Sequence, residues 1–162
     1  MSEFMKEDRV EKFVYEGFGF PVVLLNVPMK KIRGIEVPDI NYNALQLVLL
    51  DLLSHKPLPL TGNEIRFIRQ SLKMTLVEFA KHFGVTHAAV IKWEKSKDQF
   101  AKITSSTELH IRLFNLERLK VSNEKFRNTF VALDRNKKLK HQDRINSEHS
   151  KPFKIESSCV SI

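Results

Sequence analysis

The stretch Thr75–Glu94, TLVEFAKHFGVTHAAVIKWE, decides the fold in the middle of this 162-residue chain. Gly84 divides it into two apolar-periodic segments, and glycine is the residue that most readily adopts the left-handed conformation of a tight turn. Val90 and Trp93 are spaced so that they pack back on Phe79. The stretch therefore predicts two short helices joined by a turn, with the other face of the second helix directed outwards.

Hydroxyl residues followed three positions later by glutamate mark helix starts around this stretch. In such a capping box the hydroxyl accepts a hydrogen bond from the backbone three residues on, while the carboxylate reaches back. The pattern occurs at Thr61 with Glu64, at Thr75 with Glu78 and at Ser105 with Glu108, and Thr86 offers a fourth cap without the glutamate. These signals predict helices over 63–72, 76–83, 87–95 and 106–120.

The chain divides into three parts by composition. Residues 1–60 contain short β-branched and aromatic runs punctuated by glycine and proline, followed by an apolar-periodic helix after Asn41. They predict a small strand-and-turn segment with one helix. Residues 61–120 form the helical part, and residues 121–162 are rich in basic and polar side chains, which favours a largely disordered tail.

Charge and cysteine content narrow the classes of function. The three parts carry 7 basic and 8 acidic, 11 and 6, and 9 and 5 side chains, so the positive charge lies beyond Leu60 and indicates a polyanionic partner. The single cysteine, Cys159, excludes a disulfide within the chain, and no apolar run is long enough to cross a membrane. We expect a cytoplasmic, nucleoid-associated protein without a membrane partner.

The helical pattern resembles the Cro/CI-type (Xre) family of helix–turn–helix regulators over about residues 61–120. The matching positions are Thr75, Glu78, Phe79, Ala80, Phe83, Gly84, Val85, Thr86, Val90, Trp93 and Glu94. Within that family the pattern is most similar to the DNA-binding half of MqsA/YgiT-type antitoxins, which binds an operator as a dimer. The resemblance implies a mainly α fold: a lambda-repressor-like helix–turn–helix bundle with a small N-terminal strand-and-helix segment and a disordered basic tail.

The chain departs from that pattern at several positions. The segment Lys30–Gly34 follows Val27-Pro28 where those antitoxins have a Cys-x-x-Cys-Gly zinc knuckle, but both cysteines are missing. Lysine and arginine do not bind zinc, so we expect no metal and no cofactor. Leu76 replaces a glutamine that often supports a phosphate or base contact. Lys73 replaces a glycine at a turn, where a left-handed lysine costs roughly 1 kcal/mol.

The helix–turn–helix pattern assigns the candidate DNA-binding residues by position. His87 and Lys92 are expected at base edges and Ala88 at a thymine methyl group. Phosphate contacts are expected from Thr86 and Lys95, with further contacts from the flanking lysines. These flanking residues are Lys73, Lys81, Lys97 and Lys102.

One such motif spans only part of a helical turn of DNA, so we expect a homodimer on a palindromic operator. Leu109, Leu113 and Leu116 are the candidate dimer interface. The leading hypothesis is a sequence-specific transcriptional regulator, a repressor or an autoregulatory antitoxin-like protein. The alternatives are a toxin-neutralising antitoxin that acts through its N-terminal segment, and a non-specific nucleic-acid-binding protein. No nucleophile–base set or phosphate loop is present, so an enzyme is not expected.

Overall fold

The computed structural model describes residues 8–143 and 152–161, and within helix α6 it describes side chains as far as Leu133. The chain forms two compact units. Unit 1 comprises Met1–Val48 and Pro152–Ile162, and unit 2 comprises Leu49–Lys151. Helix α1 (Tyr42–His55) contributes its first half to unit 1 and its second half to unit 2.

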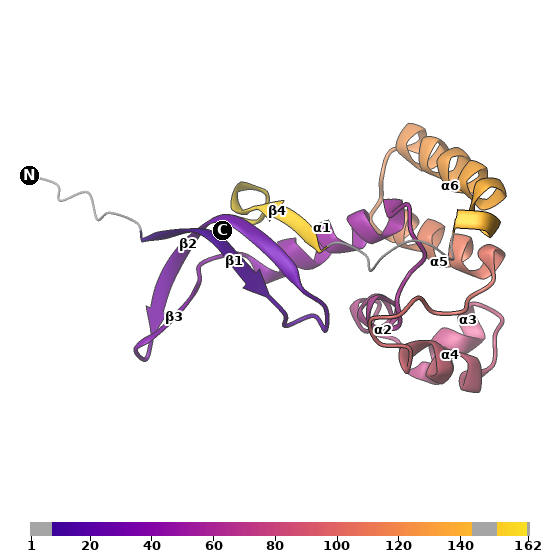
Figure 1. The fold of residues 1–162 in the computed structure, drawn as a ribbon, viewed down its shortest axis with the longest axis horizontal. Coiled ribbons are helices and arrows are strands. Elements are labelled where there is room, and N and C mark those ends of the chain that lie inside the picture. The colour runs from indigo at the N-terminus through magenta and orange to yellow at the C-terminus, as the bar shows by residue number, and fades with distance from the viewer. Residues whose placement is uncertain (1–7, 144–151, 162) are drawn as a thin grey trace, which may run out of the picture. The chain divides into compact units, whose positions relative to one another are not determined.

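Unit 1 is built on a four-stranded mixed sheet (Figure 1). The strands are β1 (Arg9–Tyr15), β2 (Val22–Ile32), β3 (Ile35–Pro38) and β4 (Phe153–Glu156). Strand β2 is central: it pairs antiparallel with β1 and β3 and parallel with β4. The short 3₁₀ helix η1 (Ser157–Val160) follows β4.

The C-terminal end of the chain completes the core of unit 1. Ile155 and Val160 are buried, as are Val22 and Leu24 of β2. The hydroxyl of Ser157 donates to the carbonyl of Asn26 at 2.6 Å. Strand β4 thus has an apolar residue at every second position, on one face of the strand, and it pairs with β2 in the parallel direction.

Two expectations are wrong at this point. The fold is not mainly α, because a mixed sheet with a parallel pair forms one of the two units. The tail is not disordered where the structure describes it, since helix α6 (Asn123–Asp143), β4 and η1 all lie beyond residue 120. The basic composition of residues 121–162 gave no indication of the two buried apolar side chains, Ile155 and Val160, that anchor their end. Residues 144–151 lie outside the described part of the chain.

Unit 2 contains the helices that the capping signals predict. They are α2 (Gly62–Ser71), α3 (Leu76–His82), α4 (His87–Glu94) and α5 (Ser105–Arg118), each within two residues of the expected limits. The boxes at Thr61 and Thr75 are confirmed. The third box is wrong, because Thr104 caps α5 and the carboxylate of Glu108 is buried against Arg112 instead.

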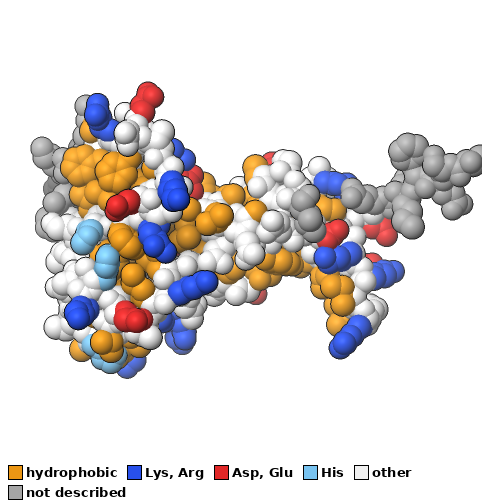
Figure 2. Space-filling model, turned by 180° about the vertical axis from the view of Figure 1, so that it is seen from behind, with side chains coloured by type: hydrophobic (Ala, Val, Ile, Leu, Met, Phe, Trp, Pro, Cys, Tyr) orange, Lys and Arg blue, Asp and Glu red, His pale blue; other side chains and the backbone are white. Residues whose placement is uncertain are grey.

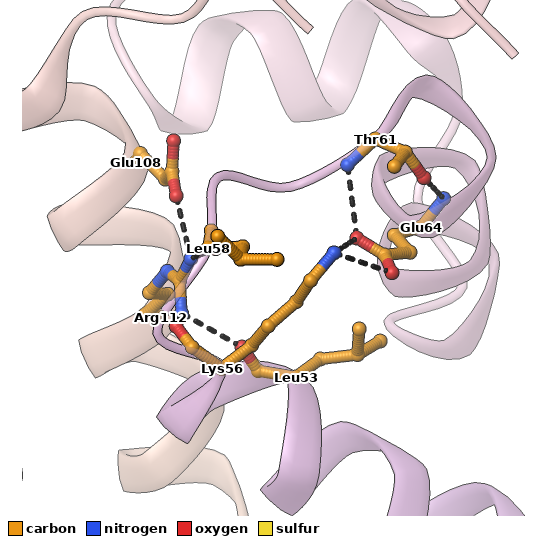
Figure 3. A network of polar contacts seen from close by, with 7 residues as sticks. All are labelled: Leu53, Lys56, Leu58, Thr61, Glu64, Glu108 and Arg112. Atoms are coloured by element: carbon orange, nitrogen blue, oxygen red, sulfur yellow. Dashed lines mark hydrogen bonds and ion pairs between the residues drawn. The ribbon is translucent and has the colours of Figure 1, made fainter. Parts of the chain in front are cut away.

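A buried polar network holds the start of α2 in place (Figure 3). The Lys56 amine contacts both carboxylate oxygens of Glu64, at 2.8 and 2.7 Å, and Glu64 also accepts from the backbone N–H of Thr61. The Arg112 guanidinium pairs with Glu108. It also donates to the backbone carbonyls at the end of α1 and beyond it, those of Leu53, Lys56 and Leu58. Each buried charge thus has an opposite charge in contact.

Candidate nucleic-acid interface

The turn between α3 and α4 forms because its residues satisfy the helix ends. Gly84 adopts a left-handed φ of 66°, and the N–H of Val85 donates to the carbonyl of Ala80 at 2.9 Å. Thr86 then caps α4, accepting from the N–H of Ala89 at 3.1 Å. No atom lies within 4 Å of a Cβ placed on Gly84, so the backbone conformation and not the space requires glycine.

One face of α4 is packed into the helical core. Val90 and Trp93 are buried, and so are Phe79 and Ala80 of α3. The interpretation of Trp93 as a core residue is therefore confirmed. These contacts fix the rotation of α4 about its own axis, which decides the residues that remain outside.

The end of α4 is tied to α2 by charge and by close backbone approach. Arg69 binds Glu94 through two hydrogen bonds, at 2.6 and 3.1 Å, and both side chains are only 12% exposed. A Cβ on Gly62 would meet the Trp93 carbonyl and would lie 2.6 Å from the backbone nitrogen of Lys97. Helix α2 therefore approaches the end of α4 as closely as a glycine permits.

The opposite face of α4 is open. Thr86, His87, Ala88 and Lys92 are all exposed, and Lys95 continues the exposed side beyond the last turn. The exposure expected for the candidate base-contacting residues is thus present, whereas the contacts themselves remain a prediction. The exposed face of α4 is therefore short and neutral to basic, and the buried residues on the opposite face of the helix hold it in place.

The other lysines that the motif assigned to phosphate contacts are exposed as well. They are Lys73, Lys81, Lys97 and Lys102. Lys73 adopts the left-handed turn conformation that its position required, with a φ of 56°, and Lys97 has a φ of 51°. The left-handed conformation of Lys97 was not apparent from the sequence, because no glycine or asparagine signals it.

A shallow cavity of about 320 Å³ lies beside the C-terminal half of α4. Arg66, Lys95 and Lys97 bring three positive charges to its lining, and Glu94 is the acidic member. Asn63, Leu76 and Ile91 complete the wall. The sequence pattern did not indicate Arg66, which lies on α2. Arg66 reaches this surface only because α2 packs against α4. Arginine and lysine are the side chains that most often contact phosphates.

The expected dimer interface on α5 needs one correction. Leu116 is fully buried within unit 2, so it is not available to a second chain. Leu109 and Leu113 are half-buried. The physical reason is that α6, which the sequence placed in a tail, packs on α5 and accounts for part of its apolar surface.

The described residues contain neither a cluster of metal-ligating side chains nor a membrane-spanning helix. No group of three or more potential ligands of the His, Cys, Asp and Glu types occurs in residues 8–143 and 152–161. Lys30 and Arg33, at the expected position of a zinc knuckle, lie instead in the hairpin between β2 and β3. Within the same described ranges, no helix is both long and apolar enough to cross a membrane.

Comparisons of the chain with protein-family models, with curated proteins and with solved structures found no match.

Proposed function

We propose that the chain is a sequence-specific DNA-binding regulator that places α4 in the major groove. The observation that carries this proposal is the division of α4 into two faces. Val90, Trp93 and Glu94 anchor the helix from behind, whereas His87 and Lys92 are exposed. An anchored helix with an open polar face is what direct readout of base edges requires.

The surrounding charge supports a phosphate-binding role for the flanks of this face. Lys95 and Lys97 line the cavity beside α4 together with Arg66. For each phosphate that the protein neutralises, the slope of the logarithm of the binding constant against the logarithm of the salt concentration becomes more negative by about 0.9. The resemblance of Thr75–Glu94 to Cro/CI-type motifs supports the same assignment.

Two copies on a palindromic site follow from the small size of the motif. A single α4 spans only 8 residues, so an operator read by one copy would be short. Leu109 and Leu113 remain candidates for the contact between copies, since both are half-buried. A protein of this kind would act in the cytoplasm, at the nucleoid, and its simplest action is repression by blocking access to a promoter.

Selection of bound fragments from random DNA at fixed salt, with the purified full-length chain, tests the proposal. We expect enrichment of a palindrome with half-sites centred about 34 Å apart. Lys92→Ala should relax the preference at one base pair by about 1–3 kcal/mol. Selection that returns no enriched sequence, with steep salt dependence, would favour the non-specific alternative and end this proposal.

The lysines of the flanks need a matched control. Lys97 and Lys120 are both exposed and both left-handed, with φ of 51° and 52°. Asparagine tolerates that conformation, so Lys97→Asn and Lys120→Asn change the charge with the same effect on the backbone. Lys97→Asn should weaken binding to all sequences alike and lower the salt slope by about one, while Lys120→Asn leaves both unchanged. Equal losses in the two variants would argue against the assigned interface.

A further inference from the structure

The hairpin between β2 and β3 extends beyond the rest of the sheet. Strand β1 pairs with β2 from Val22 to Pro28, and β4 pairs with it only as far as Leu25. The remaining residues of β2 pair with β3, from Met29 opposite Pro38 to Ile32 opposite Ile35, and beyond the Met29 N–H, which donates to the Asp8 carbonyl at 2.8 Å, no other strand pairs with them. We call Met29–Pro38 the β2–β3 arm.

The tip of this arm is apolar and exposed. Ile32 is 50% exposed and Ile35 is 67% exposed, the largest value among the exposed large hydrophobic side chains of the described residues. The two form a cross-strand pair, so their side chains lie on the same face of the arm. In Figure 2 hydrophobic atoms at this hairpin lie beside lysine and arginine side chains. Half or more of each side chain is therefore left uncovered by unit 1.

The turn at the tip keeps an arginine in an unfavourable conformation. Arg33 and Gly34 have φ of 51° and 83°, the two left-handed positions of a two-residue hairpin turn. Asparagine is the residue that such turns prefer at the first position. An arginine there costs the hairpin stability, and its guanidinium has no hydrogen bond or ion pair to any residue that the structure describes.

The other charges of the arm leave it basic near the tip. Lys30 pairs with Asp39 at 2.7 Å and Lys31 with Glu36 at 3.7 Å, and all four side chains are at least 38% exposed. Exposed pairs of this kind are worth about 0–1 kcal/mol, so both lysines remain able to exchange their partners for phosphates. Arg33 adds a third positive charge, and no acidic side chain among the described residues forms an ion pair with it. This charge favours a polyanion over an uncharged apolar partner.

We propose that the β2–β3 arm is a second DNA contact, which inserts Ile32 and Ile35 into the minor groove while Arg33 and Lys31 contact the flanking phosphates. Four residue pairs make an arm about 13 Å long, and the minor groove is about 7.5 Å deep. Apolar side chains wedged between base steps, with basic residues beside them, are a known way to hold and bend this groove. This inference rests on the proposed function only for the identity of the partner, duplex DNA.

The test uses the full-length chain and the 40-bp duplex most enriched from a random library, or the unselected library if none is enriched. Dimethyl sulfate protection separates the two grooves, because adenine N3 lies in the minor groove and guanine N7 in the major groove. The variants are Arg33→Asn, the double variant I32T/I35T, and H87A/K92A on α4. Leu47→Ser, on an exposed apolar residue of α1, is the control for loss of surface hydrophobicity.

Arg33→Asn gives the sharpest result, because stability and binding should move in opposite directions. Asparagine suits the turn, so thermal stability should be unchanged or higher, whereas DNA affinity should fall about three- to tenfold. I32T/I35T keeps β-branched side chains in the strands, and it should lose adenine N3 protection and about tenfold in affinity. Leu47→Ser should bind like the parent chain. A purely structural role for the arm predicts unchanged affinity in all three.

The four possible protection patterns separate this inference from the proposed function. Loss of N3 protection only in the arm variants, with loss of N7 protection only in H87A/K92A, supports both. Protection of N7 without N3 overturns the arm and leaves the function. Protection of N3 without N7 overturns the function and leaves the arm, and protection of neither overturns both. Binding to vesicles containing phosphatidylglycerol that I32T/I35T abolishes, with DNA affinity unchanged, would assign the tip to a lipid surface instead.

Discussion

Replacement of Lys56 by methionine tests whether the buried network under α2 stabilises unit 2 through charge pairing. Lys56 and Glu64 are 6% and 3% exposed, and their contacts lie at 2.7–2.8 Å. Burial lowers the pKa of the Lys56 amine, while Glu64 acts in the opposite direction. Lys56→Met keeps most of the side-chain volume but leaves the Glu64 carboxylate buried without its cation. Breaking a buried pair in this way costs about 3–5 kcal/mol.

The double variant K56M/E64Q distinguishes pairing from packing. Glutamine removes the buried charge but can still accept from the N–H of Thr61, as in a capping box. We therefore expect K56M/E64Q to recover most of the stability that Lys56→Met loses.

Urea unfolding followed by fluorescence measures these differences, since the only tryptophan, Trp93, is buried in the same unit. Lys125→Met is the matched control: its amine binds Asp51 at 3.0 Å, but the two side chains are 45% and 33% exposed. That exposed pair should contribute less than about 1 kcal/mol. If K56M/E64Q were no more stable than Lys56→Met, or if Lys125→Met were equally destabilised, the argument from buried charge would be wrong.

Three further predictions concern the helices that position the interface. Gly62→Ala should destabilise unit 2 by about 1–3 kcal/mol in urea unfolding, because its Cβ would overlap the backbone at the end of α4; unchanged stability would show that this approach is looser than described. A hydrogen bond from the Thr75 backbone lowers the pKa of Glu78, so its contribution is present above its ordinary pKa and is lost as pH falls through the lowered value. Glu78→Gln should therefore lose less stability than the parent chain on acidification below about pH 4.5, measured by circular dichroism. Leu116→Glu should unfold unit 2, as measured by circular dichroism, since Leu116 is fully buried. A variant that stays folded and is monomeric would instead support the assignment of Leu116 to the dimer interface.

Local sequence signals located helices α2 to α5 of unit 2 but missed α6. The hydroxyl–glutamate pairs at Thr61 and Thr75 act within four residues, and Gly84 acts through its own backbone, so none of them depends on distant parts of the chain. The period of Val90 and Trp93 likewise separated the buried from the exposed face of α4. The exposed candidates at His87 and Lys92 followed directly from that period.

Long-range pairing was decided only by the tertiary structure. The sequence indicates short strands near the N-terminus, but no local signal shows that Ile155 would reach β2 across more than a hundred residues. The same holds for Glu108, which Arg112 draws into a buried ion pair instead of a capping box, and for Arg66, which meets Lys97 only because α2 and α4 pack together. Helix caps and periodicity are properties of neighbouring residues, whereas sheet partners, buried charge pairs and surface clusters depend on which distant surfaces exclude water together.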